Sequence, residues 1–164
     1  LAIPSGATFD VTGATVTGLS AGKVLQVVTA TYSTNTAFSS TSYATSGLSC
    51  SITPASTSNK VLALYSGMCR TYDNAGNSGR WVSIRLYRVT DTTALTEQTT
   101  NQVSQDSDNE HGFCWSQVFS YLDSPSTSSA VEYRVDGKVL NSNMRLAMQN
   151  EGSTSTLTLL EIEG

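Results

Sequence analysis

Residues 131–139 read VEYRVDGKV, and the fold class follows from the pattern in this short stretch. Apolar side chains occupy every second position, with charged ones between them: Val131, Tyr133 and Val135 against Glu132, Arg134 and Asp136. A period of two turns one face of an extended strand toward a core and the other toward solvent. The stretch therefore predicts a half-buried β-strand over 130–139, and we interpret its Asp136-Gly137 pair as a hairpin-turn signal.

The same alternation recurs before and after this stretch. Further examples are Val82, Ile84 and Leu86, and Met144, Leu146 and Met148. The connections carry turn-forming residues such as Pro54 and Pro125, and apolar runs with such spacing are typical of an all-β sandwich. We expect strands over residues 23–32, 46–53, 60–69, 80–90, 94–99, 113–122, 130–139, 143–149 and 154–162.

One segment also allows a helical interpretation. In MRLAMQNEG, residues 144–152, Met144 and Met148 are four positions apart, as on one face of a helix. Its period-two pattern is equally good, and the segments next to it are predicted strands. We therefore assign it to β-structure and expect an all-β, antiparallel sandwich.

The bulk composition excludes several classes of protein. The 164 residues fit one domain, and 25 Ser and 23 Thr accompany 7 Tyr, 4 Phe and 2 Trp, which favours folded β-structure over disorder. A net charge of −4 disfavours nucleic-acid binding. No apolar run approaches the roughly 18 residues of a membrane span, so we expect no membrane insertion. Because the chain starts at Leu1 rather than Met, we interpret it as a processed or truncated product.

The chain has three cysteines, Cys50, Cys69 and Cys114. An odd number without CxxC spacing argues against a disulfide framework and against a zinc site. We expect all three to be small apolar core residues of a protein assembled in a reducing cytosol.

Residues 1–20 differ from the rest in having few apolar side chains. Gly6, Gly13 and Gly18 punctuate them, and Gly-Ala-Thr occurs twice. Such a segment cannot bury its own apolar residues, whereas several copies around a common axis can. We predict the end of a β-stalk shared by three chains, followed by a globular head over 21–164; a flexible leader is the alternative. Apolar residues on both faces of 60–65 also fit burial between subunits.

Two parts of the sequence resemble a known group of proteins. The segment from GKVLQVV at 22–28 to ITPASTSNKVLAL at 52–64, and the ending STLTLLEIEG, are similar to head domains of fibre and tail-associated virion proteins of tailed bacteriophages, above all marine and cyanobacterial ones. The Gly-Ala-Thr leader resembles the stalk before such heads. The resemblance implies a trimeric, jelly-roll-like head; residues 66–150 do not share it.

Two segments are candidate receptor-binding loops. CRTYDNAGNSGRW, residues 69–81, mixes aromatic, amide and Arg side chains between two predicted strands, and loops on rigid scaffolds commonly carry function. The competing interpretation is a polar hairpin loop with Trp81 in the core, and Trp115 is expected in the core or a subunit interface. The candidate receptor-binding residues are Arg70, Tyr72, Asp73, Asn74, Asn77, Arg80, Trp81, Asp106, Asp108 and His111.

The second of these loops, QDSDNEH at 105–111, also has residues that bind metals in other proteins. Alternating acids suit Ca²⁺, but the EF-hand pattern is absent, and we favour a solvated acidic loop. Three copies of His111 on a trimer axis would be another arrangement. We expect no metal site and no cofactor.

We expect no enzymatic activity. The single histidine, His111, and the absence of a G-x-S-x-G motif disfavour a catalytic triad. A carboxylate pair for glycoside hydrolysis is harder to exclude. Its candidates are Asp73, Asp91, Asp106, Asp108, Glu110, Asp123 and Glu132.

Together these features predict a structural protein of a phage virion, assembled in the host cytoplasm. Its role would be the distal head of a trimeric tail fibre or appendage that binds a host surface glycan or protein receptor. Two alternatives are a capsid decoration or connector protein that binds only other virion proteins, and a monomeric bacterial carbohydrate-binding module.

Overall fold

The structure is a computed structural model, which describes residues 22–73, 80–102 and 113–164. Every predicted strand is found, with ends that shift by a few residues, and the 144–148 segment is a strand as expected. The short strand β2 was not predicted. The strands are β1 (Val24–Tyr32), β2 (Thr36–Phe38), β3 (Ala44–Ile52), β4 (Lys60–Asp73), β5 (Arg80–Arg88), β6 (Thr93–Gln102), β7 (Phe113–Asp123), β8 (Val131–Val139), β9 (Met144–Met148) and β10 (Ser155–Ile162), with a 3₁₀ turn η1 (Asn150–Gly152) before β10.

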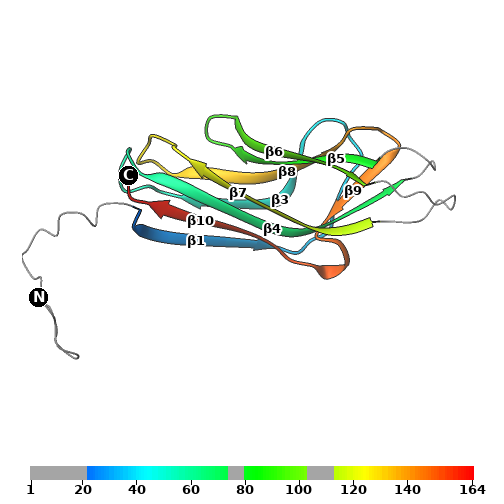
Figure 1. Ribbon diagram of the computed structural model, residues 1–164, viewed down its shortest axis with the longest axis horizontal. Helices are drawn as coiled ribbons and strands as arrows, with labels where there is room; N and C mark the ends of the chain where they lie inside the picture. The colour runs from blue at the N-terminus through cyan, green and yellow to red at the C-terminus, as the bar shows by residue number, and fades with distance from the viewer. Residues whose placement is uncertain (1–21, 74–79, 103–112) are drawn as a thin grey trace, which may run out of the picture.

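The strands form two antiparallel sheets that face each other (Figure 1). One sheet has the order β3-β8-β5-β6. In the other sheet, β1, β10, β4 and β7 are neighbours in that order. The end of β4 also pairs with β9, on the same edge as β10, and β9 pairs with β2. The pairs β5–β6, β4–β7, β3–β8 and β1–β10 are nested, like one long hairpin rolled up. This is the jelly-roll arrangement, and the all-β sandwich prediction is confirmed.

The core fills the space between the two sheets, where every second side chain of each strand points. Ile84, Leu86 and Val135 from one sheet meet Leu157 and Leu159 from the other, and all five are nearly or completely buried. The alternation read from 131–139 is therefore the inward and outward alternation of β8.

The predicted hairpin turn at Asp136-Gly137 is wrong, because both residues lie inside β8. The Asp136 carboxylate is fully buried and accepts hydrogen bonds from the guanidinium groups of Arg85 and Arg134. At Gly137 an added Cβ would lie 3.1 Å from side-chain atoms of Phe38 and Leu146. The pair is therefore explained by a buried ion pair and by close packing, and the strand continues through it.

The cysteine prediction holds for two of the three residues. Cys50 and Cys69 are free thiols in the core, whereas Cys114 is exposed. Cys114 pairs with Arg70 in the ladder between β7 and β4, at a position whose side chain points away from the core. The residue type alone did not predict on which side of β7 the Cys114 side chain lies.

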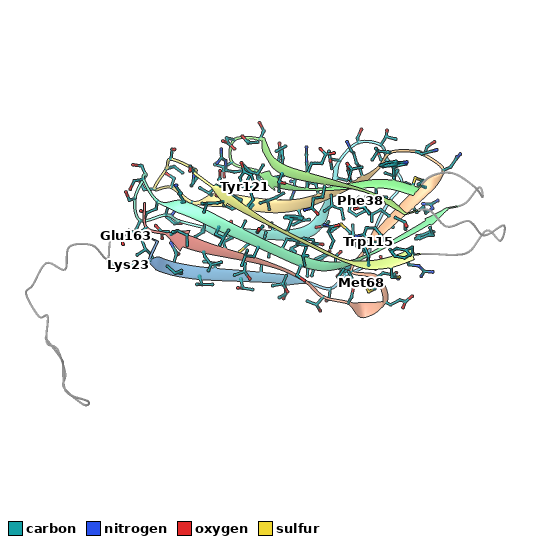
Figure 2. All side chains as sticks on the ribbon, viewed as in Figure 1. Lys23, Phe38, Met68, Trp115, Tyr121 and Glu163 are labelled. Carbon is teal, nitrogen blue, oxygen red and sulfur yellow. The ribbon has the colours of Figure 1, made fainter. Side chains whose placement is uncertain are left out.

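The two ends of the sandwich differ in what they carry. At one end, which we call the terminus end, the Glu163 amide donates to the Lys23 carbonyl at 2.9 Å and the two side chains form an ion pair at 3.4 Å (Figure 2). At the opposite end, which we call the loop end, β4 stops at Asp73, β5 starts at Arg80, and β7 starts at Phe113 (Figure 1). The predicted stalk, residues 1–20, lies outside the described residues.

Candidate interaction surfaces

Strands, rather than a loop, carry several residues of the predicted receptor-binding set. β4 runs on to Asp73 and β5 begins at Arg80, so Arg70 and Tyr72 belong to β4 and Trp81 to β5. The other members, Asn74, Asn77, Asp106, Asp108 and His111, lie outside the described residues. Among the predicted residues, the described side chains are therefore those of Arg70, Tyr72 and Trp81.

The structure does not bring these three side chains to one patch. Arg70 and Tyr72 alternate with the buried Cys69 and Thr71, so they lie on the outer face of the sheet that contains β4. The Arg70 guanidinium is 5.7 Å from the centre of the Tyr72 ring and 3.2 Å from the Glu151 carboxylate.

Trp81 lies on the outer face of the other sheet, because its neighbour Val82 takes the inward position. The Trp81 side chain is 46% exposed, so the core interpretation of this residue is wrong.

The inward face of β7 adds two more aromatic rings at the loop end. Phe113 and Trp115 stack with their ring centres 6.3 Å apart, and Phe113 is 46% exposed. Trp115 packs against the core and donates its indole N–H to the Gln117 side chain at 3.0 Å (Figure 2). The expectation that Trp115 lies in the core therefore fits. Phe113 is exposed although it points inward, because it is the first residue of β7, at the end of the sandwich.

One arginine holds two of the carboxylates that were candidates for a glycosidase pair. Asp123 accepts from Arg88 at 2.6 Å and from the Tyr133 hydroxyl at 2.7 Å, and Asp91 accepts two further bonds from Arg88. The hydrogen bonds from Arg88 lower the pKa of the Asp91 carboxyl to about 2. A general acid needs the opposite shift, because it must hold its proton near neutral pH. The Arg88–Asp123 ion pair links β5 to β7, and the Arg88–Asp91 pair lies within the β5–β6 turn.

The described residues contain neither a cluster of metal ligands nor a membrane-spanning helix. Over 22–73, 80–102 and 113–164, His, Cys, Asp and Glu side chains do not gather in any group of three that would hold a metal ion. Within these ranges, too, the structure contains no helix with the length and apolar character needed to cross a membrane. The acidic segment 105–111 lies outside them.

The outer face of the β3-β8-β5-β6 sheet carries a cluster of paired charges, which we call the charged face. The Arg85 guanidinium lies 4.0 Å from the ring centre of Tyr43 and 4.3 Å from that of Tyr87, and it also binds Asp136. Nearby, Lys138 lies 3.8 Å from the Glu97 carboxylate. The charges of this face are therefore largely satisfied by one another.

The middle of the outer face of the β1-β10-β4-β7 sheet, between Lys60 and Arg70 on β4, is different, because it is uncharged and partly apolar. One cross-strand row consists of Val27, Leu160, Leu62 and Leu122. The next two rows are Thr29, Thr158, Leu64 and Ser120, then Thr31, Thr156, Ser66 and Val118. We call these three rows the apolar face. The apolar residues on both faces of 60–65 were the one sequence signal for it.

Comparison with known proteins gives distant matches only. No protein-family model and no curated protein matches the chain. Among solved structures, it is similar to a protein of the T13 particle of infectious bursal disease virus, with 12% identity, a TM-score of 0.42, and coverage of 84% of this chain and 35% of that chain. The VP2 subviral particle of the same virus gives 12% identity, a TM-score of 0.35, and 84% and 38% coverage. The chain spans little more than a third of those proteins.

Proposed function

We propose that this protein is the distal head of a homotrimeric appendage, such as a tail fibre, on a bacteriophage virion, and that it attaches the particle to a host surface glycan or protein. The observation that supports this proposal is the difference between the two ends of the sandwich. Lys23 and Glu163 join β1 to β10 at the terminus end, while β4 and β6 end, and β5 and β7 begin, at the loop end. A head of this kind is held at one end and presents the other.

The loop end offers side chains suited to such a contact. Tyr72, Trp81 and Phe113 lie on strands beside the two connections, and Trp81 and Phe113 are exposed. Aromatic rings on rigid strands give contact area at low cost in conformational entropy, which suits sugars and protein surfaces alike. The mechanism is adhesion without a chemical step.

A three-fold assembly would make weak contacts sufficient. Three heads on one stalk present the same loops, so after the first contact the others form at a high effective concentration. The resemblance of the 22–64 and 155–164 segments to phage head domains supports this arrangement. The buried thiols of Cys50 and Cys69 fit assembly in a reducing host cytoplasm.

Cryo-electron microscopy of the intact particle that contains this chain tests the proposal. We expect three copies at the outer tip of an appendage, with Trp81 and Phe113 facing away from the particle. A map in which the loop end packs against another virion protein would contradict adhesion and indicate a decoration or connector role instead.

A further inference from the structure

We infer that identical copies of this chain contact one another through the apolar face of the β1-β10-β4-β7 sheet. The inference rests on the trimer of the proposed function and deepens it by naming the surface between subunits. It commits to a second copy of the chain as the occupant of that face.

The register of the sheet brings large apolar side chains into one row on its outer face, where no other part of the described chain covers them. Val27 is 56% exposed and Leu122 is 51% exposed, at the two edges of the sheet. Leu160 and Leu62 join them in the middle. The inward positions of the same strands are already filled, for example by Val61 and Leu159, so the row does not serve the chain's own core.

The chemistry of the face suits contact between identical surfaces. Its three rows contain no charged side chain, and the hydroxyls of Thr29 and Thr158 already lie 3.2 Å apart. Three copies that turn this face toward a common axis can meet without taking a charge out of water, which is the costly step in association. The charged face of the other sheet lacks this property, because Arg85, Lys138 and Glu97 would have to be desolvated.

The area of the apolar face is too small to hold the copies together by itself. Four strands about 4.8 Å apart and three rows about 7 Å apart give roughly 400 Å² of flat area. That is about half of what one partner contributes to a standard interface, so a further contact is needed for a stable assembly.

The stalk proposed for residues 1–20 would supply that contact. Leu25, 45% exposed, and Val27 lie three and five residues after Gly22, with which the described part of the chain begins. An interface here would adjoin the proposed three-chain stalk along β1, and it leaves Trp81 and Phe113 at the loop end free for a receptor. The row that follows toward the terminus end contains Lys60 and Ile162, and Lys60 limits the apolar face on that side.

Charge introduced at both edges of the face tests the inference. In the full chain, Val27→Lys and Leu122→Lys are combined; both side chains are more than half exposed, so the fold of a single subunit should tolerate them. The matched control is Leu140→Lys, which changes a side chain of similar exposure, 46%, outside the apolar face. Light scattering after size-exclusion chromatography measures the mass, against 17.4 kDa for one chain.

We expect a trimer for the unchanged chain and for Leu140→Lys. For the double variant we expect a monomer, with a midpoint concentration of association raised by about a hundredfold or more, because unpaired lysines would be buried in the contact. If the double variant fails to fold by circular dichroism, the triple change of Val27, Leu64 and Leu122 to Thr replaces it. It keeps β-propensity and should weaken association in the same direction.

The outcomes separate the inference from the proposed function. A trimer that survives the charged and the Thr variants would overturn the inference and leave the trimeric head standing. Dissociation by Leu140→Lys alone would also overturn it, by placing the contact elsewhere. A monomeric unchanged chain at micromolar concentration would overturn both and favour the carbohydrate-binding module.

Discussion

Glu161 on β10 accepts a hydrogen bond from the Asn59 side chain at 2.5 Å, although 102 residues separate the two in the chain. The same carboxylate, fully buried, accepts from the Ala55 amide at 2.7 Å and from the Gln26 side chain at 2.6 Å. Asn59 in turn accepts from the amide of Gly164. One buried carboxylate thus joins β1, the β3–β4 connection and the end of β10.

This hydrogen-bond network explains what three of the segments singled out in the sequence do in the structure. Gln26 belongs to GKVLQVV, Asn59 to ITPASTSNKVLAL and Glu161 to STLTLLEIEG, the three segments on which the resemblance to phage head domains rests. Their shared task in this structure is to close the terminus end of the sandwich. The resemblance is therefore explained by the structure of the terminus end, and the proposed receptor contact lies at the other end.

Replacing the buried carboxylate should destabilise the protein. In Glu161→Gln, one oxygen acceptor becomes an amide donor that faces other donors, and hydrogen bonds to a charged group are lost. We expect a loss of about 2–4 kcal/mol in the free energy of unfolding, measured by urea denaturation. The matched control is Glu163→Gln, which removes an exposed ion pair to Lys23 and should cost within about 0.5 kcal/mol. Equal losses in the two variants would contradict the role of Glu161.

The stability of the protein should fall in acid. Burial opposes ionisation of Glu161, but the hydrogen bonds from Asn59, Gln26 and Ala55 outweigh it and lower the pKa of its carboxyl below the ordinary 4.5. The pKa of Asp91 is lowered to about 2. A carboxyl with a depressed folded-state pKa stabilises the fold above its unfolded-state pKa, and this contribution is lost as the pH falls through the folded-state value.

We therefore expect a level melting temperature from neutral pH down to about pH 5 and a decline below about pH 4.5. Glu161→Gln should make that decline shallower. Added salt should weaken only the part that comes from the half-exposed Asp91. An identical acid slope in Glu161→Gln and the unchanged protein would show that Glu161 does not titrate in this range.

The ion pair between the sheets should matter more at its buried end than at its exposed end. Asp123→Asn leaves the Arg88 guanidinium facing a neutral amide at a buried position, and we expect a cost of about 3 kcal/mol in the free energy of unfolding. Asp91→Asn removes the partner on the exposed side of the same guanidinium, and its effect should be clearly smaller. Thermal denaturation of the two variants compares them directly, and a larger loss for Asp91→Asn would refute this ranking.

A glycine in β3 should be irreplaceable for two separate reasons. Gly47 and Gly22 have φ angles of +85° and +79°, where an added Cβ is strained by about 1–2 kcal/mol. At Gly47 the Cβ would also overlap the ring of Tyr32, while at Gly22 it would meet nothing within 4 Å. We expect Gly47→Ala to lower the free energy of unfolding by about 2–4 kcal/mol and Gly22→Ala by about 1 kcal/mol. Similar values in urea denaturation would mean that Tyr32 moves aside without cost.

Removal of the leader should weaken the assembly. If residues 1–20 form a stalk shared by three chains, a chain that starts at Ala21 loses those contacts and keeps only the apolar face. We expect a lower melting temperature and a higher concentration for half-association than in the full chain, measured by calorimetry and light scattering. An unchanged melting temperature would contradict the stalk.

The sequence alone was enough for nine of the ten described strands and for the fold class. Alternation in 82–86, 131–135 and 144–148 places apolar side chains on one side of an extended chain whatever partner the strand finds, because the period of two is a local property of the backbone. The signal at Asp136-Gly137 failed for a related reason: a turn preference is also local, and Arg85, contributed by β5, outweighs it with a buried ion pair.

The tertiary structure decided which outward-facing residues lie next to one another. Val27, Leu62, Leu122 and Leu160 are far apart in the chain and form one row only through the register of three ladders. Strand pairing also leaves Arg70 and Trp81 on the outer faces of different sheets, and the fold brings Asn59 to Glu161. Sequence periodicity specifies the side of a strand on which a residue points, whereas surfaces arise from strand pairing, which depends on contacts between distant segments.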